Sequence, residues 1–385
     1  MTVHAFRNGH VLLAGGQTVG AACLSVDKGR LTAISSDPRD VAAYAGAIDL
    51  QGGWLVPGFV DLQVNGGGGV LFNDATDVAG IRAIGAAHAR YGTTAFLPTL
   101  ISDNPAAIGR ALEALDAAIA AGVPGVVGVH VEGPFINPGR NGIHDPSKLR
   151  RLDEEQLSAL AQPRRGPVLV TLAPELAAPG QIRRLADAGV LVSIGHTDAT
   201  AEQVQAALAD GARGFTHLFN AMSPLHHRAP GAVGAALADR DSWCGLIADG
   251  IHVHPLALRL ALQARGSDRL MLVTDAMPSV GNDGRGFMLD GREISVIDGR
   301  CVSADGTLAG AHLDMAAAVR LMVAEGGATV AEAVRMASAT PAAFLRMEGE
   351  IGALAIGRRA DWVWLDDRLE VRETWIGGQC VARAG

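Results

Sequence analysis

Polar side chains that could bind a metal ion follow several apolar, strand-like runs in this chain of 385 residues. Glu132 ends the run GVVGVHVE, His196 ends GVLVSIGH, and His217 lies near the end of ARGFTHLF. Two imidazoles and a carboxylate are a ligand set of catalytic zinc sites, which leave a fourth position open for water. The three residues therefore predict a metal site with hydrolytic chemistry.

Asp275 ends a later run, RLMLVTDA, and is the candidate general base of such a site. Zinc lowers the pKa of a water molecule to about 7, and a nearby carboxylate can then take the proton. A lone histidine near a strand end is more often a structural residue, so the hypothesis rests on the joint placement of the four side chains. Each stands in a polar segment rich in glycine or threonine, and none lies on the apolar face of a helix.

Eight apolar runs lie between residues 58 and 276, and most precede a segment of helical periodicity. Eight strand–helix units over about 250 residues are typical of a (β/α)8 TIM barrel, in which the carboxyl ends of the strands form the active site. A doubly wound open sheet is the alternative. That fold would require neither eight units nor polar residues at nearly every strand end.

Both ends of the chain differ from this pattern. Residues 1–55 and 350–385 contain short alternating segments broken by glycine and aspartate, which are typical of β-meanders. Neither end alone has enough strands to be stable. We therefore expect an α/β protein in which residues 56–349 form the hydrolase barrel and both chain ends pair into one small β-sandwich domain.

The composition restricts the classes of partner. The formal net charge is −8 with both signs interspersed, which provides no basic face for nucleic acid and no polybasic segment for a membrane. The 4 cysteines are scattered singly, as is usual in a reducing compartment. We find no signal sequence and no apolar run long enough to cross a membrane, and expect a soluble, cytoplasmic protein.

Other histidines have different expected roles. His130 precedes Glu132 by two residues and should share its inward face, where it is expected to support the ligands by hydrogen bonding. Arg228 and His252 lie in loops after their runs. Because loops position metal ligands less rigidly than strand ends do, we expect these two residues to bind an anionic substrate group. A solvated loop charge is the alternative for both.

Six segments, in colinear order from about residue 50 to about residue 312, resemble the N-acetylglucosamine-6-phosphate deacetylase family of the amidohydrolase superfamily. They are PGFVDLQVNGGGG, HVEGPFINPGRNGIHDP, IGHTDATAEQ, THLFNAMSPLHHRAPG, ADGIHVHP and VTDAMPSVG. The resemblance implies hydrolysis of N-acetylglucosamine 6-phosphate to glucosamine 6-phosphate and acetate, in amino-sugar catabolism. It also agrees with a small β-sandwich beside the barrel.

The resemblance implies roles for individual residues. The metal would be bound by Glu132, His196 and His217. Asp275 would be the general base and then the general acid, and His144 would help to hold the amide carbonyl.

A second group would bind the rest of the amino-sugar phosphate. Asn220 and the backbone at Ala221 would hold the ligand near its phosphate, and Arg228 would pair with that phosphate. His252 would reach it from a neighbouring subunit, which implies a homodimer. Ala229 follows Arg228 where the family more often has an acidic residue, which affects how Arg228 is oriented.

The first run ends in a polar row, Gln63 and Asn65, where many amidohydrolases have a His-x-His pair for a second metal. Neutral amides are poorer zinc ligands than imidazole. We therefore expect one divalent ion per chain, zinc in the first instance, with Fe2+, Co2+ or Mn2+ as alternatives for such a site. Gln63 and Asn65 are expected to form hydrogen bonds around that ion's ligands.

Two other hypotheses remain open. The substrate could be another acylated amine, such as N-acetylgalactosamine 6-phosphate. A set of metal ligands determines the type of reaction more firmly than it determines the substrate. A non-catalytic barrel that serves as a binding protein would be expected to lack a ligand or the base, and all four residues are present. Residues 305–315 could form a glycine-rich flap over the sugar.

Overall fold

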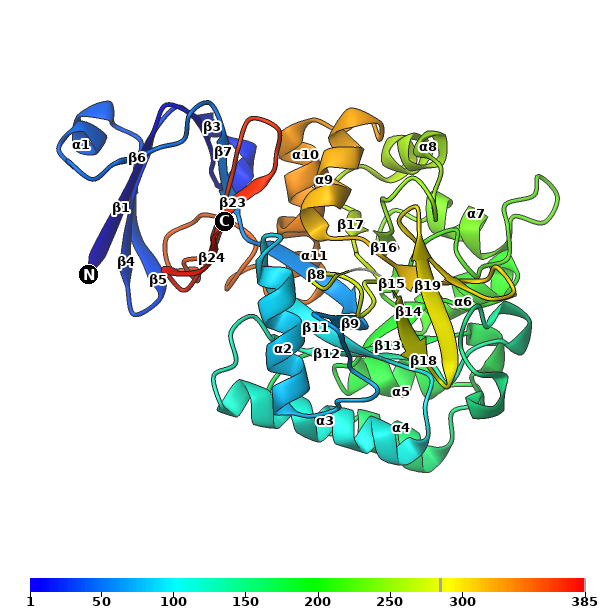
Figure 1. The fold of residues 1–385 in the computed structure, drawn as a ribbon. Coiled ribbons are helices and arrows are strands. Elements are labelled where there is room, and N and C mark those ends of the chain that lie inside the picture. The colour runs from blue at the N-terminus through cyan, green and yellow to red at the C-terminus, as the bar shows by residue number, and fades with distance from the viewer. Residues whose placement is uncertain (284–285, 384–385) are drawn as a thin grey trace.

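The computed structural model describes residues 1–283 and 286–383. The chain forms a large barrel and a smaller β-rich part beside it, and both chain ends lie in the smaller part (Figure 1). Among the described residues, no helix is long and apolar enough to cross a membrane.

Eight parallel strands form the barrel sheet, and each corresponds to one of the apolar runs. Parallel strands are covered on both faces, which is why they are continuously apolar in sequence. The predicted (β/α)8 fold is confirmed. In sheet order the strands are β8 (Phe59–Val64), β11 (Thr93–Ile101), β12 (Val129–Glu132), β13 (Val168–Leu172), β14 (Leu191–Ile194), β15 (Gly214–Phe215), β16 (Trp243–Leu246) and β17 (Leu270–Leu272).

The barrel closes where β8 meets the segment that follows β17. The Asp275 N–H donates to the Gln63 carbonyl at 2.9 Å, and the Gly66 N–H donates to the Ala276 carbonyl at 2.9 Å. This seam brings the end of the first strand beside the end of the last.

The helices of the barrel surround the sheet, and α2, α3 and α4 lie along one side of it (Figure 1). Several begin where the side chain of a polar residue accepts a backbone N–H, such as Asp77 before α2 and Asn104 before α3. The helices are α2 (Val78–Ala89), α3 (Pro105–Ala120), α4 (Glu154–Leu160), α5 (Gln181–Asp187), α6 (Ala201–Ala209), α7 (Gly231–Ala238), α8 (Pro255–Arg265), α9 (Met315–Ala324), α10 (Val330–Ala337) and α11 (Ala339–Phe344). Short 3-10 turns lie at η1 (Ala14–Gly16), η2 (Pro138–Arg140), η3 (Pro146–Lys148) and η4 (Pro174–Leu176).

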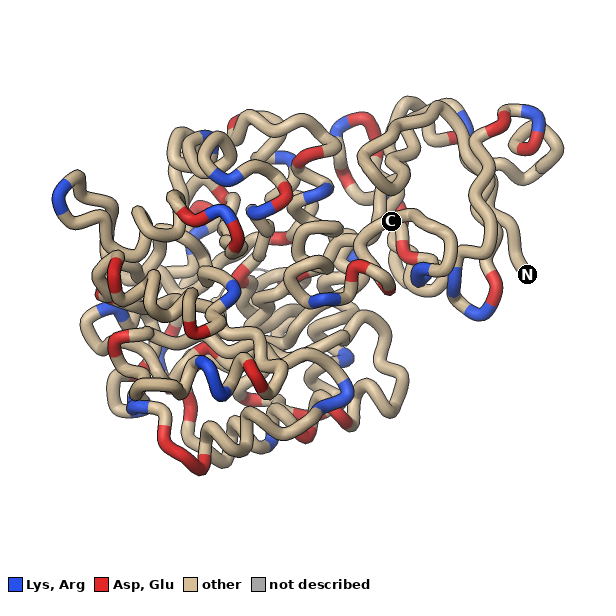
Figure 2. Tube along the Cα trace, turned by 180° about the vertical axis from the view of Figure 1, so that it is seen from behind, with Lys and Arg blue, Asp and Glu red and all other residues tan. Residues whose placement is uncertain are grey.

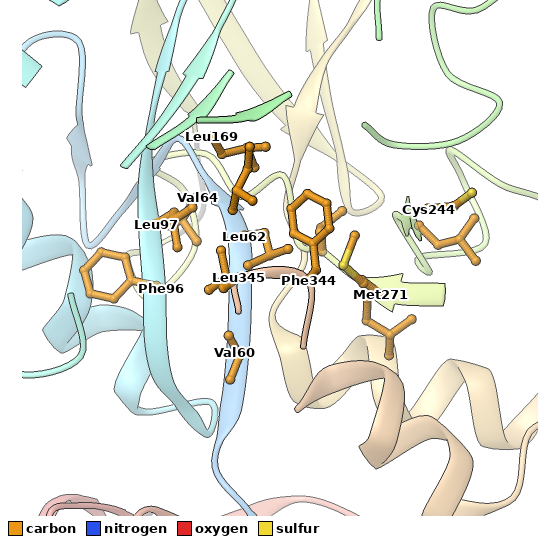
Figure 3. Close-up of a cluster of buried hydrophobic side chains, with 14 of the residues drawn as sticks. Val60, Leu62, Val64, Phe96, Leu97, Leu169, Cys244, Met271, Phe344 and Leu345 are labelled. Atoms are coloured by element: carbon orange, nitrogen blue, oxygen red, sulfur yellow. The ribbon is translucent and has the colours of Figure 1, made fainter. Parts of the chain in front are cut away.

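Apolar side chains fill the barrel. Phe344, at the end of α11, lies in the same buried cluster as Leu62 of β8 and Met271 of β17 (Figure 3). All three are at most 3 % exposed. Close packing of this kind holds the strands rigidly, and so fixes the residues that follow them.

The smaller part consists of two sheets with strand orders β5-β4-β1-β6 and β24-β23-β22-β7-β2-β3. Their strands are β1 (Thr2–Arg7), β2 (His10–Leu12), β3 (Thr18–Val19), β4 (Ala22–Asp27), β5 (Arg30–Ser35), β6 (Ile48–Asp49), β7 (Trp54–Pro57), β22 (Trp362–Leu365), β23 (Val371–Ile376) and β24 (Gln379–Arg383), with α1 (Pro38–Ala42) between β5 and β6. Val56 of β7 pairs with Val363 of β22, so both chain ends share one sheet. The predicted small β domain is present, and we propose residues 1–55 with 350–385, and 56–349, as the two domains.

A four-stranded antiparallel sheet between β17 and α9 was not predicted from the sequence. Its strands are β18 (Gly286–Leu289), β19 (Arg292–Ile297), β20 (Arg300–Ser303) and β21 (Leu308–Ala311). A small hairpin of β9 (Gly66–Gly67) and β10 (Val70–Leu71) follows β8. The Ala311 N–H donates to the Asp275 carbonyl at 2.9 Å, so the inserted sheet ends beside the mouth of the barrel.

Candidate metal centre and active site

Glu132, His196 and His217 come together at the carboxyl end of the barrel. Glu132 is the last residue of β12, whereas the histidines follow β14 and β15. Glu132 Oε1 lies 3.2 Å from His196 Nε2 and 3.0 Å from His217 Nε2, and the two nitrogens are 3.0 Å apart. All three side chains are buried.

The spacing of these three atoms fits a tetrahedral metal ion. Zinc bonds of about 2.0–2.2 Å separate two ligand atoms by roughly 3.3 Å. Burial alone would raise the pKa of Glu132, but hydrogen bonds from His196 and His217 hold it well below its usual range. An ionised carboxylate and two imidazoles are the donor set that a divalent cation such as zinc accepts.

The backbone conformation is unusual at two of the candidate metal ligands and at the candidate base. His196, His217 and Asp275 have φ angles of 47°, 36° and 51°, in the left-handed region that non-glycine residues rarely adopt. Such strain is found mainly at functional sites. The left-handed conformation changes the direction of each side chain sharply where the chain leaves the strand.

Two amide side chains donate hydrogen bonds to the candidate base, and one of them also bonds a candidate metal ligand. Gln63 Nε2 donates to Glu132 Oε1 and to Asp275 Oδ1, at 3.0 Å each. Asn65 Nδ2 donates to the same Asp275 oxygen at 2.7 Å. Burial and the nearby charge of Glu132 raise the pKa of Asp275 to about 6, while the Asn65 hydrogen bond opposes the increase. Asp275 is thus a buried carboxylate that is ready to exchange a proton near neutral pH.

His144 lies against the metal-binding residues, with its ring centroid 4.6 Å from that of His196. Burial, followed by the charge of His196, lowers the pKa of His144 to about 3, so the ring is neutral. Its Nδ1 accepts from the Ser102 N–H at 3.3 Å and lies 2.7 Å from Ser102 Oγ. Since Nδ1 is an acceptor, the proton is on Nε2, which is free to donate to a ligand.

His130 is not part of the metal-binding group. Its Nε2 lies 2.7 Å from Thr171 Oγ1, and its Nδ1 lies 3.3 Å from Thr99 Oγ1. Burial lowers its pKa to about 4. These bonds fix a neutral ring between neighbouring strands, two residues before Glu132 in β12.

A cavity of about 270 Å³ connects these groups with the surface. Besides the metal-binding and candidate base residues, its lining includes His144, Asn65, apolar side chains such as Ile247 and Met277, and residues of the inserted sheet. Leu308 and Gly310 of β21 are among the latter, and with Thr307, which precedes β21, they lie in the predicted flap 305–315.

The candidate phosphate-binding residues fall into two places. Asn220, Ala221 and His252 line the cavity, and His252 Nδ1 is held by Asp249 Oδ2 at 2.6 Å. Because Nδ1 is occupied, Nε2 remains for a ligand. Because His252 lines the cavity of its own chain, we propose that it acts there and not from a neighbouring subunit.

Arg228 lies elsewhere. It sits in an exposed turn between His226 and Ala229, on the loop that projects before α7 (Figure 1). Within the described part of the chain, the cavity lining includes neither Arg228 nor any other arginine or lysine. Positive and negative residues are interspersed over the rest of the molecule, in agreement with the sequence (Figure 2).

Sequence reasoning gave no role to two residues that support the site. Ser102 follows the second apolar run and fixes the tautomer of His144. Asp61 lies two residues before Gln63 and accepts from Thr274, next to Asp275. A polar residue within or directly after a buried run was the available signal in both cases.

Comparisons with known proteins agree with this geometry. The model of the amidohydrolase family matches residues 54–381. The chain is 44 % identical over 337 residues to the N-acetylgalactosamine-6-phosphate deacetylase of Shewanella sp. (strain ANA-3), covering 87 % of this chain and 85 % of the relative. It is 39 % identical over 352 residues to the N-acetylglucosamine-6-phosphate deacetylase of Homo sapiens, with coverage of 87 % and 85 %.

Solved structures give the same result. The N-acetylglucosamine-6-phosphate deacetylase from Pasteurella multocida superimposes with a TM-score of 0.94 at 32 % identity, covering 99 % of this chain and 100 % of that one. A mutant enzyme of the same name from Mycobacterium smegmatis, in complex with N-acetyl-D-glucosamine-6-phosphate, gives a TM-score of 0.89 at 32 % identity with the same coverage.

Proposed function

The chain belongs to the amidohydrolase family, and we propose that it hydrolyses the acetamide of N-acetylglucosamine 6-phosphate to glucosamine 6-phosphate and acetate. The resemblance seen in the sequence is confirmed by the relatives, which are amino-sugar-phosphate deacetylases. The observation that supports this reaction most directly is the Gln63 amide. Its two hydrogen bonds, 3.0 Å each, join the metal-binding Glu132 to the candidate base Asp275 in one cavity.

We propose that Glu132, His196 and His217 bind one zinc ion per chain. Iron, cobalt or manganese would also suit two imidazoles and a carboxylate. When bound, such an ion lowers the pKa of a water molecule and polarises the amide carbonyl. Gln63 and Asn65 take part through hydrogen bonds to the carboxylates.

Asp275 acts as base and then as acid in this proposal. It takes one proton as the water oxygen bonds to the carbonyl carbon, and it returns that proton to the nitrogen as the carbon–nitrogen bond breaks. The bonding electron pair stays on nitrogen, and the products are an amine and acetic acid, which gives acetate once its proton passes to the amine. His144 Nε2 donates to the carbonyl oxygen, where negative charge develops.

The far end of the cavity would bind the sugar phosphate. Asn220, the backbone at Ala221 and the free Nε2 of His252 supply hydrogen-bonding groups there. The phosphate lies far from the reacting carbon, and the energy of binding it helps to hold that carbon in position for the reaction.

We propose a homodimer in which Arg228 pairs with the phosphate in the other subunit's cavity. Arg228 is exposed at the tip of a projecting turn, and its own cavity is lined by other residues. The planar guanidinium group of arginine matches the geometry of a phosphate better than any group in that lining does. We also propose the cytoplasm as the compartment, because in the described chain none of the 4 cysteines forms a disulfide.

The test is acetate release by the purified protein together with its metal content. N-Acetylglucosamine 6-phosphate, its unphosphorylated sugar and N-acetylgalactosamine 6-phosphate should be compared, because named relatives act on each of the two phosphorylated epimers. We expect about one metal ion per chain and the highest kcat/KM on the first substrate. A higher value on the galactosamine epimer would reassign the substrate, and absence of both metal and activity would favour a binding protein.

A further inference from the structure

The side chain of Asn65 has one buried polar atom that nothing in the described chain satisfies. Asn65 is 1 % exposed, and its Oδ1 is without a hydrogen-bond partner among the described residues. Buried polar atoms of native proteins are nearly always paired, so this one requires an explanation.

The orientation of this amide is fixed. Asn65 Nδ2 lies 2.7 Å from Asp275 Oδ1, and an ionised carboxylate can only accept. The nitrogen must therefore face Asp275, which leaves Oδ1 as the other end of the amide. Asn65 and Asp275 both line the cavity, so the residue that carries the unpaired acceptor lies beside the candidate base.

The missing donor is expected to belong to a ligand. Glu132 and Asp275, the nearest carboxylates in the lining, are acceptors when ionised, and His144 Nε2 is assigned to the carbonyl oxygen. The ligand group that must approach Asp275 is the amide nitrogen, since that nitrogen receives the proton. Its own N–H is then the donor closest to Asn65.

We propose that Asn65 is a catalytic residue whose Oδ1 accepts the N–H of the scissile amide and of the departing amine. The proposal rests on the proposed deacetylation. As the carbonyl carbon becomes tetrahedral, the nitrogen loses amide resonance, takes a proton from Asp275 and becomes a stronger donor. The hydrogen bond therefore strengthens towards the transition state, which raises kcat more than it lowers KM.

An ester analogue isolates this hydrogen bond. In the 2-O-acetyl ester of glucose 6-phosphate, oxygen replaces the amide nitrogen, so no N–H is present, while Asp275 must still deliver a proton. Asn65→Leu removes the acceptor and also the donor to Asp275. Loss of that donor affects proton transfer by Asp275 with both substrates, and a variant that loses only such a donor measures how far this alone changes the ratio of amide to ester kcat.

We expect Asn65→Leu to lower the amide-to-ester kcat ratio about tenfold, the usual scale for one neutral hydrogen bond. Gln63→Leu is the matched control, because Gln63 donates to the same Asp275 oxygen but is absent from the cavity lining of the described chain. Its ratio should stay near the wild-type value. Asn65→Gln keeps a donor for Asp275 and an acceptor, and it should retain more of the ratio than the leucine variant does, even if the leucine variant folds poorly.

Metal content and the thermal unfolding midpoint of each variant should be measured alongside the rates. Equal losses on amide and ester would overturn the proposal and assign Asn65 Oδ1 to the attacking water. A lower metal content in Asn65→Leu would also overturn it and assign Oδ1 to a cation. A wild-type protein that releases no acetate from the amide would instead contradict the proposed deacetylation itself.

Discussion

Thr274 Oγ1 donates to Asp61 Oδ2 at 2.6 Å, which joins the segment after the last barrel strand to a carboxylate on the first. The Thr274 N–H donates to the other oxygen of Asp61 at 3.2 Å. Asp61 is fully buried, and Thr274 immediately precedes the left-handed backbone of Asp275. Asp61 therefore anchors the strained segment that presents the candidate base.

Removing this anchor should affect both stability and rate. Asp61→Ala leaves the buried Thr274 N–H unpaired and the Thr274 hydroxyl with only its 3.3 Å hydrogen bond to the Gln63 carbonyl, which costs about 2 kcal/mol of unfolding free energy. The kcat should fall at least about tenfold, because small displacements of a positioned group are costly. Asp61→Asn can still accept from Thr274 and should be milder in both respects. Urea unfolding and acetate release measure the two effects, and an alanine variant with wild-type kcat would contradict the anchoring role.

The stability contribution of Asp61 should depend on pH. Burial raises its pKa to about 7, whereas an aspartate in the unfolded chain titrates near 3.9. The folded state thus binds the proton more tightly, so the contribution is fully present below about pH 4 and is lost as the pH rises to about 7. Asp61→Asn cannot titrate. Its unfolding free energy relative to wild type should therefore increase over this range, and a constant difference would contradict the burial of an ionisable group there.

The barrel was predictable because its strands are buried on both faces. Runs such as PVLVTLA, which forms β13, stand out as continuously apolar segments, and the turn after each strand must present its next polar residue at the mouth. Glu132, His196 and His217 could be grouped on that basis alone. What brings them within 3.2 Å of one another is the left-handed backbone at the histidines, which no propensity indicates.

The inserted sheet was not predictable by the same argument. Strands β18 to β21 are only 4 to 6 residues long and partly exposed, so they lack a continuous apolar run. The spacing of residues in the sequence also could not indicate which cavity His252 lines. Its place depends on the hydrogen bond to Asp249, and only coordinates show that this fixes the ring inside its own cavity.

Metal affinity should fall in acid. Burial alone would lower the pKa of His217, but the hydrogen bond and charge of Glu132 outweigh it and raise the pKa above 6.5 in the metal-free site. A metal ion binds only the neutral imidazole, so a proton must leave as the metal binds. The apparent affinity should therefore rise with pH through neutrality, by up to about tenfold per pH unit. Zinc titrations in buffers of different ionisation enthalpy measure the released proton, and a pH-independent affinity would contradict the assignment of His217 as a ligand.

Asp275→Asn should separate binding from turnover. The amide has nearly the same shape but cannot take up a proton, so kcat should fall by roughly 10²–10⁴-fold. Metal content and product affinity, measured by elemental analysis and calorimetry, should remain near wild type. In the wild-type enzyme the rate should decrease as the pH falls through the pKa of Asp275. Near-full activity in the asparagine variant would exclude Asp275 as the base.

Arg228 gives a prediction that depends on the assembly. If its guanidinium pairs with the phosphate in the partner's cavity, Arg228→Ala should lower kcat/KM for the phosphorylated substrate about 100-fold. The unphosphorylated sugar should be little affected. Exposed His227, in the same turn, provides the control His227→Ala, which should change neither value much.

A mixture of two inactive variants distinguishes an arginine supplied in trans from one supplied by the same chain. Arg228→Ala chains retain Asp275, and Asp275→Asn chains retain Arg228. In a mixed dimer, the cavity of the first chain has its own base and receives the arginine of the second. Unfolding and refolding the two variants together at equal concentration should therefore restore about one quarter of wild-type activity, because half of the dimers are mixed and each has one complete site. No recovery, with mixed dimers verified by mass spectrometry, would show that Arg228 acts within its own chain or not at all.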